Sequence, residues 1–113
     1  MNRGEIWWAD LEAPGGAGPG YRRPLLVVQT DGFNRSLIAT TICVVLTSNV
    51  RLAEAPGNVL IPPRASGLPK DSVANVSQVV TVDKVRLGER VGKLPPRFMR
   101  AVSEGLRLVL LVS

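Results

Sequence analysis

The 113-residue sequence contains no histidine and a single cysteine, Cys43. Histidine is the commonest metal ligand and the commonest general base, so its absence excludes a Ser-His-Asp or Cys-His nucleophile within one chain. A lone thiol forms no intramolecular disulfide, and without histidine or a second cysteine a zinc site is excluded as well. Catalysis by this chain would have to use arginine, lysine, carboxylates, hydroxyls and backbone groups, with no metal and no cofactor expected.

Long apolar runs are also missing, because no stretch approaches the roughly 18 residues of a membrane-spanning helix. The first four residues lead into a strand pattern rather than into the apolar segment of a signal peptide. Cys43 lies inside an apolar run and fits a reducing compartment. Together these observations predict a soluble, cytoplasmic protein that does not enter a membrane.

The length and a hydrophobic fraction of 45% predict one domain, residues 1–113, with a substantial core. Fourteen Lys and Arg residues against nine Asp and Glu residues give a formal net charge of +5 and a pI near 10.4. A charge of this sign favours an anionic partner, such as nucleic acid or an acidic protein.

Short β-branched runs between Gly- and Pro-rich turns dominate the chain, and they predict strands at 5–11, 25–29, 40–47, 59–61, 71–80 and 85–91. The last of these is expected at a sheet edge. In the turn after the second strand, Phe33 is expected to fill the core. Helical spacing after Pro96 predicts one helix with a core-facing stripe of Phe98, Ala101, Val102, Gly105, Leu106 and Val109. Six or seven short strands and a C-terminal helix indicate a mainly β, barrel-like fold.

Two adjacent arginines, Arg22 and Arg23, stand before Pro24 and the apolar run 25–29. Proline pushes the residue before it toward extended geometry, so a loop is expected to lead into a buried strand with both arginines at its start. Guanidinium groups fixed there would offer donors to a phosphate; equally, both residues would be solvated loop residues. The preceding segment 12–20 is too rich in Gly and Pro for a helix or strand and predicts a mobile loop.

Other polar and aromatic residues lie at the ends or faces of the expected strands. The core face of the first strand is expected to consist of Trp7, Ala9 and Leu11. Trp8, on the other face, is either a stacking platform for a base or a packed structural aromatic. Asn75 and Ser77 share the side of Val73, which suggests a polar groove or a junction.

Five segments in the right order resemble the MazF/PemK toxins of bacterial toxin-antitoxin modules, nearly end to end. They are Arg3–Trp7, Gly20–Pro24, Leu46–Asn49, Asp71–Gln78 and Thr81–Lys84. The resemblance implies an SH3-like small β-barrel that forms a homodimer. It also implies a metal-independent, sequence-specific endoribonuclease (mRNA interferase) that cleaves single-stranded RNA and mRNA and so inhibits translation and growth. A cognate acidic, MazE-like antitoxin would neutralise it by placing its tail in the RNA groove.

Carried over residue by residue, the resemblance makes Arg23 and Thr47 the catalytic pair. A ribose 2′-hydroxyl would attack the adjacent phosphorus and leave a 2′,3′-cyclic phosphate and a 5′-hydroxyl. Arg23 would neutralise charge on the non-bridging oxygens while Thr47 fixes the phosphate, and the proton would pass to solvent or to a carboxylate such as Asp10 or Glu12. The RNA-binding candidates are Trp8, Tyr21, Arg22, Ser48, Asn49, Asn75, Ser77 and Gln78.

The chain departs from the family's pattern in two places. Some members carry an acidic residue or a histidine in the loop before the arginine, where this chain has only Gly and Pro around 15–20. Others carry an Arg and an Asp where this chain has Asn75 and Ser77, so those members' acid-base assignments do not transfer. The competing expectation is a non-enzymatic toxin of the same barrel shape that binds DNA gyrase or nucleic acid.

Overall fold

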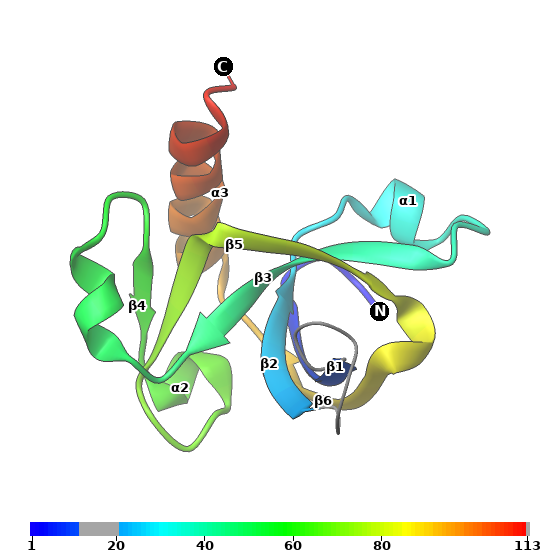
Figure 1. Ribbon diagram of the computed structural model, residues 1–113, viewed down its shortest axis with the longest axis horizontal. Coiled ribbons are helices and arrows are strands. Elements are labelled where there is room, and N and C mark those ends of the chain that lie inside the picture. Colours follow the sequence, from blue (N-terminus) through cyan, green and yellow to red (C-terminus); the bar gives the residue numbers. More distant parts are fainter. Residues whose placement is uncertain (12–20, 113) are drawn as a thin grey trace.

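The computed structural model describes residues 1–11 and 21–112. Its six strands form one antiparallel sheet in the order β4-β5-β3-β2-β1-β6, curled into a half-barrel (Figure 1). The strands are β1 (Glu5–Leu11), β2 (Tyr21–Val27), β3 (Thr40–Thr47), β4 (Val59–Ile61), β5 (Ser72–Asp83) and β6 (Leu87–Lys93). The helices are α1 (Asp31–Asn34), α2 (Pro63–Ser66) and α3 (Pro96–Leu110), with 3-10 turns η1 (Val50–Glu54) and η2 (Lys84–Arg86).

The predicted bounds of β1, β3 and β4 are confirmed, and β6 lies at the expected sheet edge. β5 continues to Asp83, three residues beyond the predicted end at residue 80, because Thr40 and Thr41 of β3 pair with Asp83 and Val82. The Gly- and Pro-rich loop predicted for 12–20 lies outside the described residues. Among the helices of the described part, none is long and apolar enough to span a membrane.

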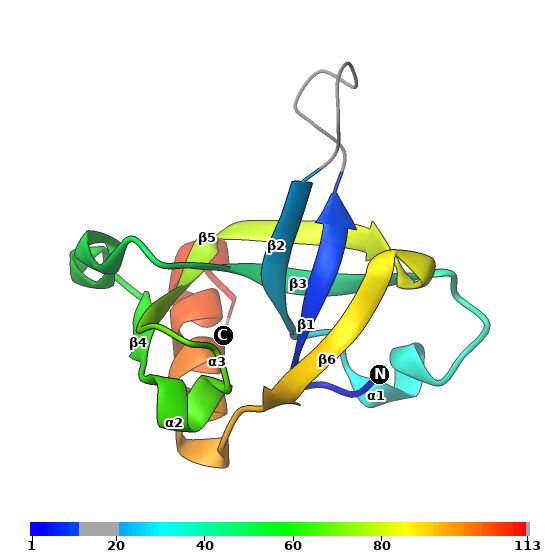
Figure 2. The same ribbon diagram turned by 90° about the horizontal axis from the view of Figure 1, so that it is seen from below.

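A bulge in β5 bends the sheet. Val44 of β3 pairs with Val79 of β5, whereas the next β3 residue, Val45, pairs with Asn75. Residues 76–78 therefore have no counterpart on β3, and an insertion of this kind bends a strand and increases its twist. Figure 2 shows how strongly the whole sheet twists, since β1 and β2 cross β3 and β5 at a steep angle.

Two clusters of buried apolar side chains lie on opposite faces of the central strands. Leu26 and Val44 belong to the first cluster, whereas Leu25 and Val45 belong to the second, as the alternation of a β-strand requires. The expected core face of β1 is confirmed, since it contributes Trp7, Ala9 and Leu11 to the second cluster. Its other face is buried as well, through Ile6 and the half-buried Trp8 in the first cluster.

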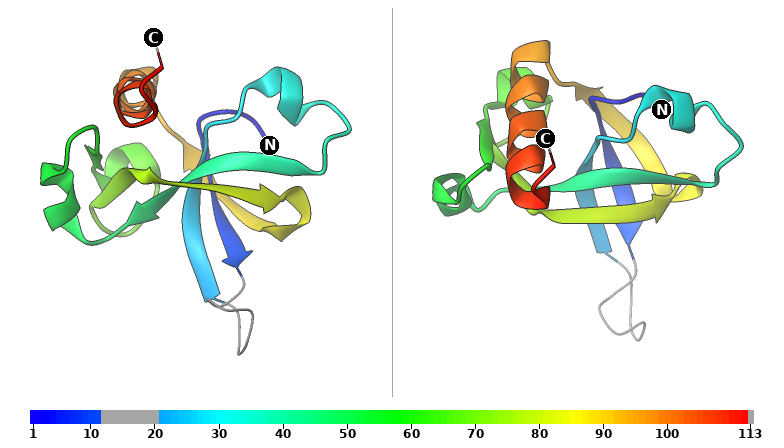
Figure 3. Two further views of the ribbon diagram at one scale, coloured as in Figure 1. Left: turned by 45° about the horizontal axis from the view of Figure 1, so that its top comes forward. Right: turned by 90° about the horizontal axis from the view of Figure 1, so that it is seen from above.

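The C-terminal helix α3 packs beside β4 and the start of β5 through a close backbone contact (Figure 3). A Cβ placed on Gly105 would lie only 2.1 Å from the carbonyl oxygen of Gly57, so the two glycines set the position and rotation of α3. The side chains that pack inward are Phe98, Met99, Val102 and Leu106. Two members of the predicted stripe, Ala101 and Val109, are exposed instead, because Met99 takes the inward position and the last turns extend past the sheet.

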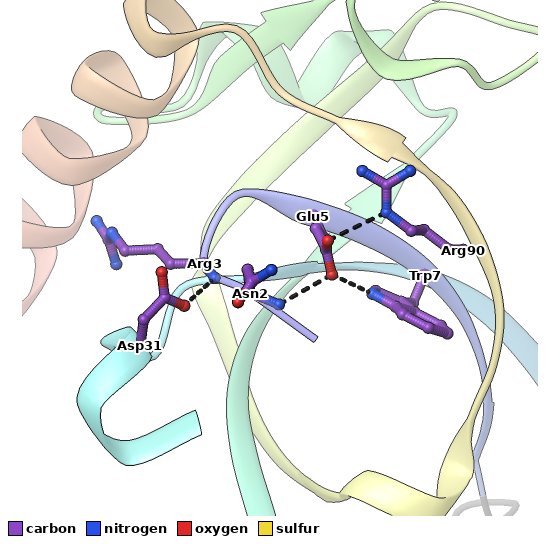
Figure 4. A network of polar contacts seen from close by, with 6 residues as sticks. All are labelled: Asn2, Arg3, Glu5, Trp7, Asp31 and Arg90. Carbon is purple, nitrogen blue, oxygen red and sulfur yellow. Dashed lines mark hydrogen bonds and ion pairs between the residues drawn. The ribbon is translucent and has the colours of Figure 1, made fainter. Parts of the chain in front are cut away.

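A polar network around Glu5 joins the N-terminal segment to β6 (Figure 4). Glu5 Oε1 accepts hydrogen bonds from Asn2 N (2.9 Å) and Trp7 Nε1 (3.1 Å), and Oε2 pairs with Arg90 Nε at 3.1 Å. Burial disfavours the charge of this carboxylate, but the three donors outweigh burial and lower the pKa of Glu5. The ionised form is therefore the form that stabilises the fold.

A second polar network anchors α1. Arg3 N donates to Asp31 Oδ1 at 2.6 Å (Figure 4), and this bond, followed by one from Asn34, lowers the pKa of Asp31. The buried Asn34 accepts from Thr41 Oγ1 at 2.9 Å. The prediction that Phe33 fills the core was wrong, because Phe33 is 60% exposed. The helical turn directs Asn34 inward, where hydrogen bonds satisfy it, and leaves the neighbouring aromatic ring in solvent.

Candidate functional site

Both arginines lie inside β2, which begins four residues before the predicted strand at 25–29 and ends at Val27. β2 begins at Tyr21 and pairs with β1 along its length, so a hairpin extends the strand over the arginines. Pairing with β3 starts only at Leu25. Pro24, which has no N–H to donate, therefore lies where the ladder to β3 has ended. Successive strand residues point to opposite faces, so Arg22 and Arg23 project to different sides.

The register of β2 and β3 brings Arg23 and Thr47 to the same part of the sheet. Leu25 pairs with Val45, and Arg23 and Thr47 each stand two residues further along their strands, beyond the last pair. Residues two apart share a face of a strand, so Arg23 and Thr47 lie on the face of Leu25 and Val45. Both residues are half-buried. Strand pairing thus makes neighbours of two residues that are distant in the sequence.

Arg23 and Thr47 line one pocket of about 370 Å³. Its polar lining is completed by Ser48, Lys70 and Ser72, and its apolar lining consists of Trp8, Pro24, Leu46, Leu68 and Pro69. The walls come from β1, β2, β3 and the segment that joins α2 to β5. Cationic and hydroxyl groups beside apolar surface suit a phosphate that carries a ribose and a base.

The hydroxyl group of Thr47 is oriented by the backbone behind it. Thr47 Oγ1 accepts a hydrogen bond from Asn49 N at 3.2 Å, which leaves its own hydrogen to donate to a ligand. The Asn49 side chain caps η1, where its Oδ1 accepts from Arg51 N at 3.3 Å. Asn49, a predicted RNA-binding residue, therefore supports the pocket and does not line it, whereas Ser48 does.

Trp8 forms one wall of the pocket, and Arg22 stacks against it. The Arg22 guanidinium carbon lies 5.3 Å from the centroid of the indole ring. Arg22 also pairs with Asp10 and Glu89, each at 3.8 Å, and all three side chains are exposed. A cation–π contact at such a site contributes about 0.5–1 kcal/mol. Trp8 therefore packs against the first cluster and also lines the pocket, so its proposed role as a stacking platform for a base stays a prediction.

The other predicted RNA-binding residues lie outside the pocket. Asn75 is buried at the β5 bulge, where its Nδ2 donates to Gln78 Oε1 and its Oδ1 accepts from Ser77 Oγ, both at 2.9 Å. Asn58 donates to the same Oδ1 at 3.2 Å. Asn75 and Ser77 can therefore lie on the side of β5 expected to face the core, because these hydrogen bonds satisfy their polar groups. Tyr21 is 40% exposed at the start of β2.

Lys70 and Ser72 line the pocket but were not predicted from the sequence. Lys70 is exposed, and its carbonyl accepts a hydrogen bond from the buried Ser72 hydroxyl at 3.3 Å. The sequence did contain a pattern that points to Lys70. It follows Pro69 just before a strand rich in β-branched residues, and Arg23 likewise adjoins a proline, Pro24. It was missed because a cation in a connecting loop is usually only a solvated charge.

Cys43 does not line the pocket, and the described residues form no cluster of metal ligands there. Burial raises the pKa of the Cys43 thiol to about 12, so this cysteine is no nucleophile at neutral pH. No group of three or more His, Cys, Asp or Glu side chains in residues 1–11 and 21–112 is placed to hold a metal ion. The chemistry of the pocket is that of its cations and hydroxyls.

Comparisons with known proteins agree on one family. Residues 2–110 match the family described as PemK-like, MazF-like toxin of type II toxin-antitoxin system. The endoribonuclease MazF6 of Mycobacterium tuberculosis is 50% identical over 110 residues, which cover 97% of this chain and 96% of that protein. The endoribonuclease EndoA of Bacillus subtilis is 34% identical over 97% of this chain and 94% of its own.

Solved structures resemble this chain over its whole length. An endoribonuclease from a mycobacterial species, in complex with its cognate antitoxin, superposes with a TM-score of 0.80 at 26% identity, covering 100% of this chain and 97% of that one. A MazE-MazF structure from Deinococcus radiodurans gives 0.81 at 22% identity, with coverage of 100% and 97%. These likenesses confirm the expected mainly β, barrel-type fold with a C-terminal helix.

Proposed function

The chain belongs to the PemK-like, MazF-like toxin family of type II toxin-antitoxin systems, and from that premise we propose how its pocket cleaves RNA. It is an endoribonuclease toxin, as are the relatives of 50% and 34% identity that it matches almost end to end. Its partner is an antitoxin, as for the related mycobacterial endoribonuclease. The substrate we propose is single-stranded RNA, including mRNA, cut at a specific sequence without a metal ion.

Arg23 acts as the electrostatic catalyst of the proposed reaction. When a ribose 2′-oxygen attacks the adjacent phosphorus, negative charge builds on the non-bridging oxygens. A guanidinium keeps its charge and presents a planar fork of donors that matches those oxygens. Held on a half-buried strand beside Pro24, Arg23 needs little reorganisation to meet this charge. Its role is stabilisation of the transition state rather than removal of a proton.

Thr47 positions the scissile phosphate. With its oxygen already accepting from Asn49 N, the Thr47 hydroxyl donates its hydrogen to a phosphate oxygen and favours the in-line geometry. The bond from the 2′-oxygen to phosphorus forms while the bond from phosphorus to the 5′-oxygen breaks. Water accepts the 2′-hydroxyl proton and supplies one to the 5′-oxygen, because Asp10 is paired with Arg22 and does not line the pocket. The other carboxylate considered, Glu12, lies outside the described residues.

The arrangement of Arg23 and Thr47 in one pocket is the observation that supports this proposal most. The products would be a 2′,3′-cyclic phosphate and a 5′-hydroxyl. We further propose that the protein acts as a cytoplasmic homodimer that inhibits translation and growth. An acidic, MazE-like segment of the antitoxin would compete with RNA for the basic surface, in keeping with the net charge of +5.

The test is to incubate the purified protein with a labelled RNA pool in EDTA and to map new 5′-hydroxyl ends. The wild-type protein is expected to cut at one recurrent sequence and to spare substrates with 2′-deoxyribose at the cut position. Arg23→Ala should abolish cutting without changing the circular dichroism spectrum or the thermal melt. The matched control is Arg35→Ala, because Arg35 is exposed beside α1 and does not line the pocket.

Retained cleavage by Arg23→Ala would reject the assignment of Arg23. RNA binding by the wild-type protein without any cleavage would favour the non-enzymatic alternative instead. Cleavage that stops in EDTA and returns with a divalent cation would refute the metal-independent reaction.

A further inference from the structure

A second cation reaches the pocket from the side opposite Arg23. β3 lies between β2 and β5 in the sheet, so Arg23 on β2 and Lys70 just before β5 stand on either side of Thr47. Arg23 and Lys70 both line the same pocket.

The segment that carries Lys70 is held firmly by its neighbours. Gly67, with φ of +81°, ends α2, and its N–H donates to Pro63 O at 2.8 Å. Leu68 is buried, and its N–H donates to Ser66 Oγ at 2.9 Å. The Ser72 hydroxyl then binds the Lys70 carbonyl at 3.3 Å. The backbone of Lys70 is thus fixed on both sides, whereas its side chain extends into solvent at the pocket.

The pocket that the two cations share has apolar and hydroxyl groups in its lining and no carboxylate of the described residues. Leu46, Leu68 and Pro69 are among its apolar lining residues. In residues 1–11 and 21–112, neither Arg23 nor Lys70 forms an ion pair. Two cations in one pocket can each bind a phosphate of the same RNA strand, while the apolar lining accommodates the uncharged nucleoside that joins the two phosphates.

We propose that Lys70 forms a second phosphate subsite, which binds the RNA phosphodiester next to the scissile one. The inference rests on the proposed function, because it takes Arg23 and Thr47 as the site of the scissile phosphate. An ammonium group is a compact charge with three rotatable donors, which suits a phosphate that is held and does not react. Lys70 would fix the strand at a second point and so present the scissile phosphate to Arg23 in line for attack.

The first experiment measures binding to a short, fluorescent, single-stranded 2′-fluoro RNA pool of random sequence, which has no 2′-hydroxyl and is not cut. For single strands, each phosphate contact contributes about 0.7 to the slope of log affinity against log salt concentration. Lys70→Ala should reduce the slope by about this amount, whereas Lys70→Arg should keep it. Lys93→Ala, a cation removed outside the pocket, should leave the slope unchanged. An unchanged slope in Lys70→Ala overturns the proposal.

The second experiment locates the phosphate on a 2′-fluoro strand that carries the mapped cleavage sequence. A methylphosphonate, which is neutral, replaces either the scissile phosphate or a neighbouring one. Substitution at one neighbouring phosphate should weaken binding by the wild-type protein and have no further effect in Lys70→Ala. Substitution at the scissile phosphate should still weaken binding by Lys70→Ala. The separate subsite is contradicted if Lys70→Ala removes the effect of the methylphosphonate at the scissile phosphate. It is also contradicted if Lys70→Ala removes the effect at none of the phosphates.

The two proposals fail in different ways. If Arg23→Ala still cuts RNA, the proposed mechanism is wrong, yet the salt slope of Lys70→Ala still reports on the subsite. If cutting requires Arg23 but Lys70→Ala changes neither the slope nor the methylphosphonate response, only the subsite is wrong. Circular dichroism and thermal melts of each variant confirm that a lost contact is not a lost fold.

Discussion

Replacing Gly105 with alanine tests the contact that holds α3 in place. In the interior of an exposed helix, Gly→Ala stabilises a protein by about 1 kcal/mol. Here the added Cβ would lie 2.1 Å from Gly57 O, 2.9 Å from Gly57 C and 3.1 Å from Val76 Cγ1. Two of these atoms belong to the backbone and cannot rotate away. We therefore expect the opposite sign, destabilisation.

The size of the effect follows from the displacement that the new methyl group requires. A distance of 2.1 Å must grow to at least 3.0 Å, so α3 has to move by about 0.9 Å and partly withdraw Val102 and Leu106 from the first cluster. Overpacking of this kind costs up to about 3 kcal/mol, and the helix preference of alanine returns about 1 kcal/mol. The net loss is about 2 kcal/mol, or about 8 °C in Tm for a domain of this size.

Urea unfolding followed by circular dichroism measures this loss, and Gly32→Ala is the matched control. Gly32 is also a helical glycine, in α1, but a Cβ there meets no heavy atom within 4 Å. Gly32→Ala should leave stability unchanged or raise it by up to about 1 kcal/mol. If both alanines stabilise the protein equally, the contact between Gly57 and Gly105 does not position α3 and the reasoning is refuted.

Three further predictions concern the pocket, acid stability and the thiol. Thr47→Val should lower the cleavage rate about 10²- to 10³-fold at unchanged Tm, while Thr47→Ser keeps most of the activity. If Thr47→Val cleaves RNA as fast as the wild type, the hydroxyl has no role in the mechanism. Because the pKa of Glu5 is lowered, its stabilisation is present above about pH 4.3 and is lost as pH falls through the lowered pKa. Urea titrations from neutral to acid pH should therefore show a smaller fall in the free energy of unfolding for Glu5→Gln than for the wild type. Cys43 should resist a thiol reagent at neutral pH until the protein is unfolded, since burial raises its pKa to about 12; rapid labelling of the native protein would contradict its burial.

The sequence was sufficient for features that depend on local pattern. β-branched runs placed β1, β3 and β4 correctly because side-chain shape and alternation act within a few residues. Pro96 and the helical spacing after it located α3 for the same reason. Family resemblance added the fold and the pairing of Arg23 with Thr47, which no local pattern contains.

Other features depended on which distant segments meet, and only the tertiary structure decided them. The aromatic Phe33 is exposed and the polar Asn34 is buried, the opposite of what their polarity suggests. The reason is that α1 directs the Asn34 side chain toward Thr41 on β3. Asn75 is buried rather than open to a groove because the bulge in β5 folds its neighbours back onto it. Residue type alone does not carry this information.

The amino-acid sequence by itself determined a basic, histidine-free, mainly β domain with one C-terminal helix and two arginines before a proline. The tertiary structure decided that Arg23 and Thr47 share a pocket, that Lys70 joins them from the far side of β3, and that a pair of glycines fixes α3. The physical reason is the distance along the chain over which each effect acts. Propensity and periodicity act along the chain, whereas a site is assembled across it by strand register and by the contacts that bend the sheet.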